Sequence, residues 1–215
     1  MKKLISLYII ILLASNQLNA QVTSFKNLDG NQKETFRNNL YASSEKINSL
    51  ECNFIQKQVL SMLSDEVVSK GTMTFKKTER LLWTYTTPYE FVFLMNNGRI
   101  TTKSEGKTSS FDSGSSPLMK ELCKIMVAGL KGDTKSLETS FNTKYLTNGS
   151  QIKVVMTPRN KSLGSIFNQI DLLFDAGTYL VSSIEMAEPS GDKTTISINN
   201  VKINGTVDDK VFDIH

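Results

Sequence analysis

Apolar and polar side chains alternate along the segment from Gly71 to Pro88, and this alternation predicts two abutting β-strands. In the first strand, Met73 and Phe75 share one face with Lys77, because successive side chains of a strand point to opposite faces. The second strand aligns three more large side chains: Leu81, Trp83 and Tyr85. A face of this composition fits an ordinary core and equally the wall of an apolar binding cavity.

The segment from Asp29 to Ile47 predicts an amphipathic helix, because its apolar residues recur at helical intervals. From Leu50 the period becomes that of a long strand, with Cys52 and Phe54 on the same face as Leu50. We expect the opposite, polar face of this strand to contain Asn53 and Gln56. The chain therefore predicts a helix followed by a long strand that leads into the Gly71 pair.

Three Asn-Gly pairs predict tight type I′ turns between later strands, at Asn97-Gly98, Asn148-Gly149 and Asn204-Gly205. A parity change after Ile198 predicts a bulge at Asn199-Asn200. The expected strands are Phe91 to Met95, Arg99 to Lys103, Phe141 to Leu146, Gln151 to Met156, Ile170 to Phe174, Leu180 to Met186 and Thr194 to Ile203. About ten antiparallel strands are too many for a flat open sheet, so the fold class is mainly β, a curled antiparallel sheet forming an incomplete, half-open barrel.

A second helix is predicted from Pro117, with Ser116 as its cap. The apolar side of this helix contains Leu118, Leu122, Ile125 and Met126. The preceding segment, Thr101 to Ser116, is small and polar, which predicts a mobile connection. A helix on such a connection is suited to act as a lid over the curled sheet.

Residues 1–20 combine Lys2 and Lys3 with a short apolar run and a small-residue junction, which predicts a signal peptide cleaved before Gln21. Its removal takes away two positive charges and lowers the formal net charge from +4 to +2. A nearly neutral chain has no footprint for nucleic acid. We expect a periplasmic protein in which residues 21–215 form a single domain.

The sequence has little that supports catalysis. Its single histidine is His215, the last residue, which argues against a Ser-His triad and against a His-containing metal site. Cys52 and Cys123 do not form a Cys-x-x-Cys motif, and both a disulfide and two buried thiols are compatible with their positions. We therefore expect a protein that is not an enzyme and that has no metal and no cofactor.

The helix from Asp29, the Phe54-x-Gln56 strand, the Gly71 strand, the Trp83-x-Tyr85-x-x-Pro88 piece and the closing Val211 to Ile214 together resemble the LolA family of periplasmic lipoprotein carriers. This resemblance covers nearly all of residues 21–215. It implies an unclosed barrel covered by helices, with an apolar cavity for the acyl chains of lipoproteins. It also implies two partners: an inner-membrane ABC-type lipoprotein release complex and an outer-membrane receptor lipoprotein. In the family, an Arg helps to hold the lid closed, and the matching residue here is Lys77, which lacks the planar fork of Arg.

Taken together, the pattern and the resemblance predict a monomeric carrier with a cavity wall and a lid. The predicted wall is Met73, Phe75, Trp83, Tyr85, Phe91 and Phe93, and the predicted lid is Leu118, Leu122, Ile125 and Met126. Two alternatives remain open at this point. One is a LolA-like envelope protein that binds another lipid or hydrophobic ligand, and the other is a non-transport interaction module whose barrel is filled.

Overall fold

The computed structural model describes residues 24–62, 65–77, 79–130 and 132–214. The predicted signal peptide, its cleavage point before Gln21 and His215 lie outside this range. The strands are β1 (Lys26–Asn27), β2 (Ser49–Val59), β3 (Glu66–Lys76), β4 (Arg80–Thr87), β5 (Phe91–Asn96), β6 (Arg99–Ser104), β7 (Lys107–Asp112), β8 (Phe141–Thr147), β9 (Gln151–Pro158), β10 (Gln169–Asp175), β11 (Val181–Ala187) and β12 (Lys193–Ile203). The α-helices are α1 (Gly30–Glu45), α2 (Pro117–Leu130), α3 (Thr134–Leu137) and α4 (Lys161–Gly164), and short 3₁₀ turns cover Ser113–Ser115 and Asp209–Phe212. No helix in these ranges is long and apolar enough to cross a membrane.

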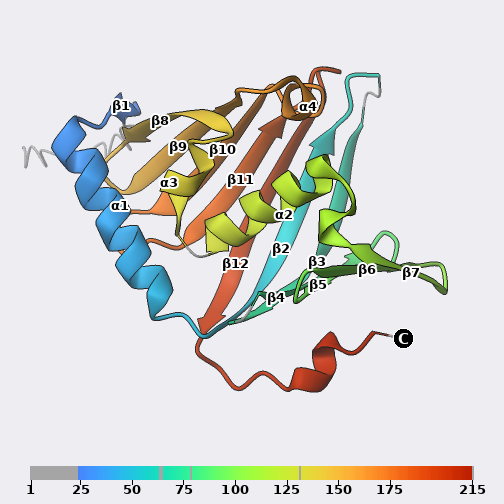
Figure 1. The fold of residues 1–215 in the computed structure, drawn as a ribbon. Coiled ribbons are helices and arrows are strands. Elements are labelled where there is room, and N and C mark those ends of the chain that lie inside the picture. Colours follow the sequence, from blue (N-terminus) through green and yellow to red (C-terminus); the bar gives the residue numbers. More distant parts are fainter. Residues whose placement is uncertain (1–23, 63–64, 78, 131, 215) are drawn as a thin grey trace, which may run out of the picture.

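All twelve strands belong to one antiparallel sheet in the order β1-β8-β9-β10-β11-β12-β2-β3-β4-β5-β6-β7. The strands at the two edges of the sheet, β1 and β7, do not pair with each other, so the sheet is not closed into a barrel. This confirms the predicted fold class. The contact between β12 and β2 joins the late strands to the early ones. The sheet curls strongly, and α1, α2 and α3 lie over its concave side (Figure 1).

The bulge predicted in the last strand is confirmed, because the register between β12 and β2 shifts between Asn199 and Lys202. Asn200 has a φ of 53°, which is the left-handed conformation that a non-glycine residue adopts mainly as Asn or Asp. The extra residue bends β12 and increases the local twist. The bulge therefore helps the sheet to curl.

Only one of the three Asn-Gly predictions is correct as stated. Asn97 and Gly98 both have positive φ, 49° and 81°, as a type I′ turn requires. At Asn148-Gly149 only the glycine has positive φ, and the Asn148 side chain instead accepts from the backbone N–H of Gln151. Asn204 has a φ of 58°, but no hairpin strand follows it, because the chain leaves the sheet there.

The prediction of a mobile connection from Thr101 to Ser116 is wrong. This segment contains most of β6 and all of β7, joined by a tight turn in which Glu105 and Gly106 have positive φ. Strand β7 is the sheet edge and is exposed on both faces except at Phe111, so no alternation of buried apolar residues marks it in the sequence. The approach to α2 is therefore an ordered strand.

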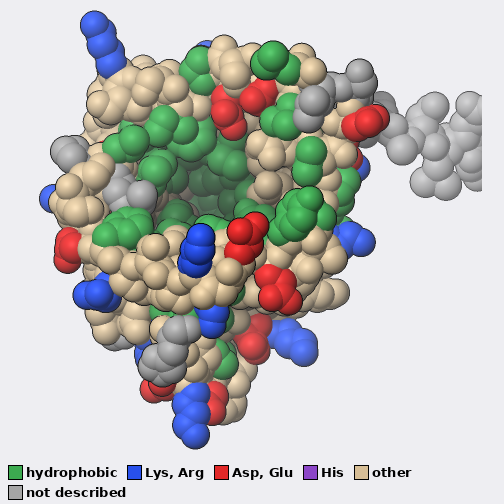
Figure 2. All heavy atoms as spheres, turned by 90° about the vertical axis from the view of Figure 1, so that its right-hand side faces the viewer, with side chains coloured by type: hydrophobic (Ala, Val, Ile, Leu, Met, Phe, Trp, Pro, Cys, Tyr) green, Lys and Arg blue, Asp and Glu red, His purple; other side chains and the backbone are tan. Residues whose placement is uncertain are grey.

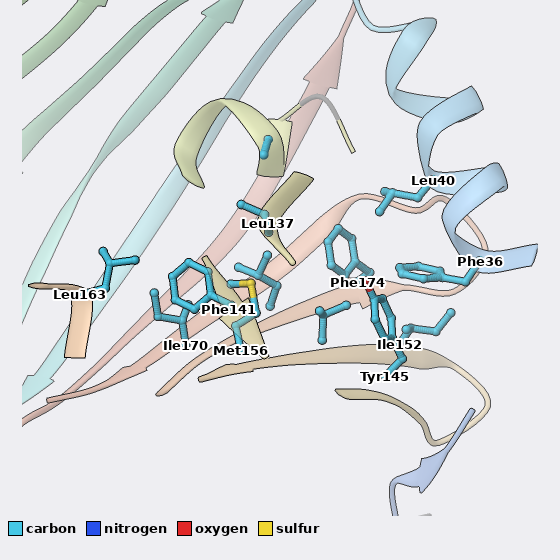
Figure 3. Close-up of a cluster of buried hydrophobic side chains, with 13 residues drawn as sticks. Phe36, Leu40, Leu137, Phe141, Tyr145, Ile152, Met156, Leu163, Ile170 and Phe174 are labelled. Atoms are coloured by element: carbon cyan, nitrogen blue, oxygen red, sulfur yellow. The ribbon is translucent and has the colours of Figure 1, made fainter. Parts of the chain in front are cut away.

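Helix α1 starts with a capping box: the Asp29 side chain accepts from the N–H of Gln32, whose side chain accepts in return from the N–H of Asp29. Its buried residues Phe36 and Leu40 pack on strands β8, β9 and β10 in one hydrophobic cluster, hereafter the β8–β10 cluster (Figure 3). The rings of Phe36 and Phe174 meet edge to face at 5.5 Å. The helix therefore covers the part of the concave face that β8, β9 and β10 form.

An ion-pair network fixes the N-terminal half of α1 to the chain after α3. Glu138 accepts from Arg37, from Lys33 at 3.1 Å and from Thr143 at 2.8 Å. Burial alone raises the pKa of Glu138, but these three hydrogen bonds outweigh it and lower the pKa from 4.5 to about 2. The stabilisation is therefore present above pH 4.5 and is lost as the pH falls through about 2.

Replacing Arg37 with Met is expected to lower the free energy of unfolding by about 2 kcal/mol at neutral pH, because it leaves the Glu138 carboxylate without one of its two cationic partners. Urea denaturation measures this loss. Lys57→Met is the control, since the Lys57–Glu66 pair is exposed and its removal is expected to cost less than about 0.5 kcal/mol. Equal losses in the two variants would contradict a special role for the network.

The convex side of the sheet carries a small core of its own. After β12 the chain crosses this side, where Val207 and Phe212 pack against Leu94 and Leu82. Lys76 and Arg80 pair with Asp209 there, the latter at 3.0 Å. The C-terminal segment is thus fixed on the face opposite to the helices.

Candidate ligand-binding cavity

Between the concave face and the helices lies a cavity of about 450 Å³. It is lined almost wholly by apolar side chains from β2 to β5, from β10 to β12, and from α1 and α2. Figure 2 shows a hollow lined with hydrophobic atoms that opens on one face of the molecule, with charged side chains around its rim. Its volume falls in the range of roughly 300–1,000 Å³ that is usual for sites of small ligands.

Strand register explains how the β3–β5 wall forms. Met73 lies opposite Trp83, and Trp83 lies opposite Phe93, so these three side chains form one rung across the sheet. Tyr85 lies opposite Phe91 in the next rung. All five line the cavity, as expected for the predicted wall.

Phe75, the sixth residue of the predicted wall, does not line the cavity. It shares the face of Met73 but lies between Leu50 and Leu81 on the neighbouring strands, and it is 4% exposed. These residues belong to a second hydrophobic cluster, hereafter the β2–β6 cluster, which also contains Ile47 just after the C-terminal end of α1. Phe75 therefore packs in the core behind the cavity.

Gly71 allows the aromatic side chains of this wall to approach each other. It lies opposite Phe54 on β2 and opposite Tyr85 on β4, and a Cβ at this position would lie 1.9 Å from the carbonyl oxygen of Thr84 and 2.6 Å from Cζ of Phe54. The ring of Phe54 occupies the space above the glycine, 5.0 Å from the rings of both Trp83 and Tyr85. Only glycine fits here, because backbone and ring approach too closely for any side chain.

A second wall of the cavity, formed by β10 to β12, was not predicted as part of the site. Its lining residues come from β10, β11 and β12: Ile170, Leu172, Val181, Ile184, Met186, Ile196, Ile198 and Val201. Their alternation in the sequence indicates buried strand faces, but it does not tell which strands face the helices or which strand is the neighbour of β2. The β12–β2 pairing brings Ile198 directly opposite Phe54 and joins this second wall to the strands of the first.

Helix α2 lies across the concave face (Figure 1). Of the predicted lid residues, Leu122, Ile125 and Met126 line the cavity, whereas Leu118 packs at the β8–β10 cluster outside the lining. Leu122 and Ile125 also contact the β8–β10 cluster, and Met126 contacts the β2–β6 cluster. The helix thus connects the β8–β10 cluster with the β2–β6 cluster above the cavity.

Lys77 does not contact α2 through any described hydrogen bond or ion pair. Its Nζ donates to the backbone carbonyl of Glu45 at 2.6 Å, and its side chain is 42% exposed. This contact ties the end of β3 to the C-terminal end of α1, where an unpaired carbonyl favours a cation. The cation predicted to hold the lid therefore holds α1 in this structure.

The polar groups of the cavity are few. Gln56 lines it, although the sequence predicted this residue on the opposite face, and its side chain accepts a hydrogen bond from the phenol of Tyr85 at 2.8 Å. Gln56 follows Phe54 by two residues, so strand geometry puts both on the concave side. Ser43, Ser44 and Tyr179 also line it, and most of the other lining residues offer hydrocarbon contacts.

The two cysteines are free thiols, and both are buried. Burial raises the pKa of Cys52 to about 11, although a hydrogen bond with the backbone of Met73 opposes it in part, and burial also raises the pKa of Cys123. Both therefore remain protonated thiols at neutral pH. Within the described ranges, no three His, Cys, Asp or Glu side chains come together as a metal site. The arrangement is suited to bind an apolar chain.

Comparison with known proteins gives a family match over residues 45–215, to the outer membrane lipoprotein carrier protein LolA. Outer-membrane lipoprotein carrier proteins from two strains of Pseudomonas putida, GB-1 and KT2440, are each 22% identical over 168 residues, which is 78% of this chain and 78% of the relative. Among solved structures, the Pseudomonas aeruginosa MucA/MucB complex matches with a TM-score of 0.50 and 11% identity, over 84% of this chain and 60% of that one. A LolA superfamily protein from Nitrosomonas europaea matches with a TM-score of 0.43 and 10% identity, over 83% and 97%.

Proposed function

Because the chain belongs to the LolA family of outer membrane lipoprotein carrier proteins, we propose that it carries lipoproteins from the inner to the outer membrane with their acyl chains sheltered in the cavity. The observation that carries this proposal is the apolar, open-mouthed cavity of about 450 Å³. It supports a carrier over an interaction module with a filled barrel. A binding function without catalysis agrees with the protonated state of both buried thiols.

The proposal includes the place of action and the partners. The carrier works in the periplasm, receives cargo from an inner-membrane ABC-type release complex and delivers it to an outer-membrane receptor lipoprotein. The names of the Pseudomonas relatives support the destination at the outer membrane. The carrier acts as a monomer, and residues 21–215 form its single domain.

Part of the favourable free energy of acyl-chain binding must be offset when cargo enters the cavity. Each buried methylene is worth about 0.8 kcal/mol, so several fully sheltered chains would exceed the roughly 20 kcal/mol ceiling of non-covalent affinity. A carrier bound so tightly would not release its cargo. Displacement of α2, which costs its contacts with both clusters, offsets part of the gain. In this proposal α2 is the lid, and Leu122, Ile125 and Met126 are its contact residues.

Fluorescence of Trp83 tests the binding step, because it is the only tryptophan in the chain and it lines the cavity. Titration with palmitoylglycerol is expected to shift or quench its emission in a saturable way. The transfer step is tested by adding the protein to spheroplasts that carry a labelled lipoprotein and measuring soluble carrier–lipoprotein complex. An unchanged spectrum together with no released lipoprotein would overturn the proposal.

A further inference from the structure

One side-chain hydrogen bond interrupts the apolar wall that strands β2 to β5 form. The phenol of Tyr85 on β4 donates to Oε1 of Gln56 on β2 at 2.8 Å, and both side chains line the cavity. Strand β3 lies between β2 and β4, and the residue opposite Tyr85 on it is Gly71. Because Gly71 has no side chain, the Tyr85 ring can reach across β3 to the Gln56 amide.

The phenol is held in a fixed position. Its ring packs edge to face against Phe54 at 5.0 Å and against Phe91 at 6.0 Å. Burial raises the pKa of Tyr85, so it keeps its proton and remains a donor. The indole N–H of Trp83 lies close enough to oppose this rise in part, yet it is buried and makes no hydrogen bond of good geometry with a described group.

The Gln56 amide is consequently oriented. With Oε1 on the phenol, its NH₂ group points elsewhere, and no described hydrogen bond uses Nε2. Nε2 is not one of the buried polar atoms that lack a partner, so it keeps accessible surface, and its residue lines the cavity. An open donor in a wall of hydrocarbon is a place where a ligand acceptor gains a hydrogen bond.

We infer that Gln56 recognises the carbonyl oxygen of an acyl ester through its Nε2–H, with Tyr85 as the residue that positions the amide. The inference rests on the proposed function and adds a chemical selectivity to it. An apolar wall lets a chain slide along it without preference, whereas one directional donor fixes how deep the chain enters. It also separates acyl esters from alkyl chains that lack a carbonyl.

The test compares two lipids that differ only in this carbonyl: 1-palmitoylglycerol and 1-O-hexadecylglycerol, its ether analogue. Each displaces a fluorescent fatty-acyl probe from the full chain, and the ratio of their dissociation constants is the readout. For the unaltered protein the ester is expected to bind about fivefold tighter, as one neutral hydrogen bond of about 1 kcal/mol provides. Gln56→Met, which preserves size without the amide, is expected to bring the ratio to one. Tyr85→Phe is expected to give an intermediate ratio.

Gln58→Met is the matched control, because it makes the same change two residues along β2, outside the cavity lining. Its ester-to-ether ratio should equal that of the unaltered protein. Equal binding of both lipids by the unaltered protein, or a preference retained in Gln56→Met, would overturn the inference while probe binding keeps the carrier proposal intact. A protein that binds neither the probe nor either lipid would overturn both.

Discussion

Replacement of Ile198 with Trp is expected to lower the affinity for an acyl probe about 100-fold. Ile198 is half-buried, lines the cavity from β12 and lies opposite Phe54, so an indole at this position projects into the space that a chain would occupy. Exclusion of about three to four methylene groups, at about 0.8 kcal/mol each, accounts for a loss of this size. Probe titration measures it. Thermal stability should hold, because the added ring fills empty volume and displaces no packed side chain.

Ile203→Trp is the control for this experiment. It places the same substitution on the same strand, but Ile203 is 50% exposed and lies outside the cavity lining. We expect unchanged probe affinity. If both variants bind the probe as the unaltered protein does, acyl chains do not occupy the space beside Ile198, and the cavity assignment fails.

The second large effect is expected at Gly71. Gly71→Ala puts a methyl group against the backbone oxygen of Thr84 and the ring of Phe54, neither of which can yield without moving β4 or the aromatic wall. We expect a loss of about 3 kcal/mol in the free energy of unfolding, at the upper end for overpacked sites. Probe affinity should fall as well, because Trp83 and Tyr85 shift with their strand.

Gly30→Ala controls for the general effect of removing a glycine. No atom lies within 4 Å of a Cβ at Gly30, the first residue of α1, so Ala is expected to leave stability unchanged or to raise it by up to about 1 kcal/mol. Urea denaturation of both variants gives the comparison. A Gly71 variant as stable as the Gly30 variant would show that the wall adapts, and the close fit around Phe54 would then have no energetic meaning.

Much of the fold could be predicted from the sequence, because local patterns determine it. Period-2 alternation marked the strands around Trp83, and the positive φ values that Asn97-Gly98 adopts correspond to its turn type. The same dipeptide at Asn204-Gly205 led out of the sheet, since a turn propensity does not say whether a partner strand follows. Edge strand β7 escaped notice because a strand solvated on both faces carries no apolar period.

The site was predictable only in part, for reasons of register. Parity on β3, β4 and β5 was enough to find five wall residues, but it did not separate Phe75, which register places in the core. The position of the second wall, formed by β10 to β12, depends on the long-range pairing of β12 with β2, and no local pattern encodes that pairing. The partner of Lys77 could not be predicted either, because its contact with Glu45 depends on where α1 ends in space.

The central claim is that acyl chains lie inside the curled sheet beneath α2. Photocrosslinking with a palmitoylglycerol that carries a diazirine at the end of its chain tests this most directly, with labelled peptides identified by mass spectrometry. The account predicts labels on the cavity lining, at residues such as Phe93, Ile184 and Met126, and their loss in the Ile198→Trp variant. Labels confined to exposed residues such as Met62 and Tyr89, unaffected by that variant, would contradict it.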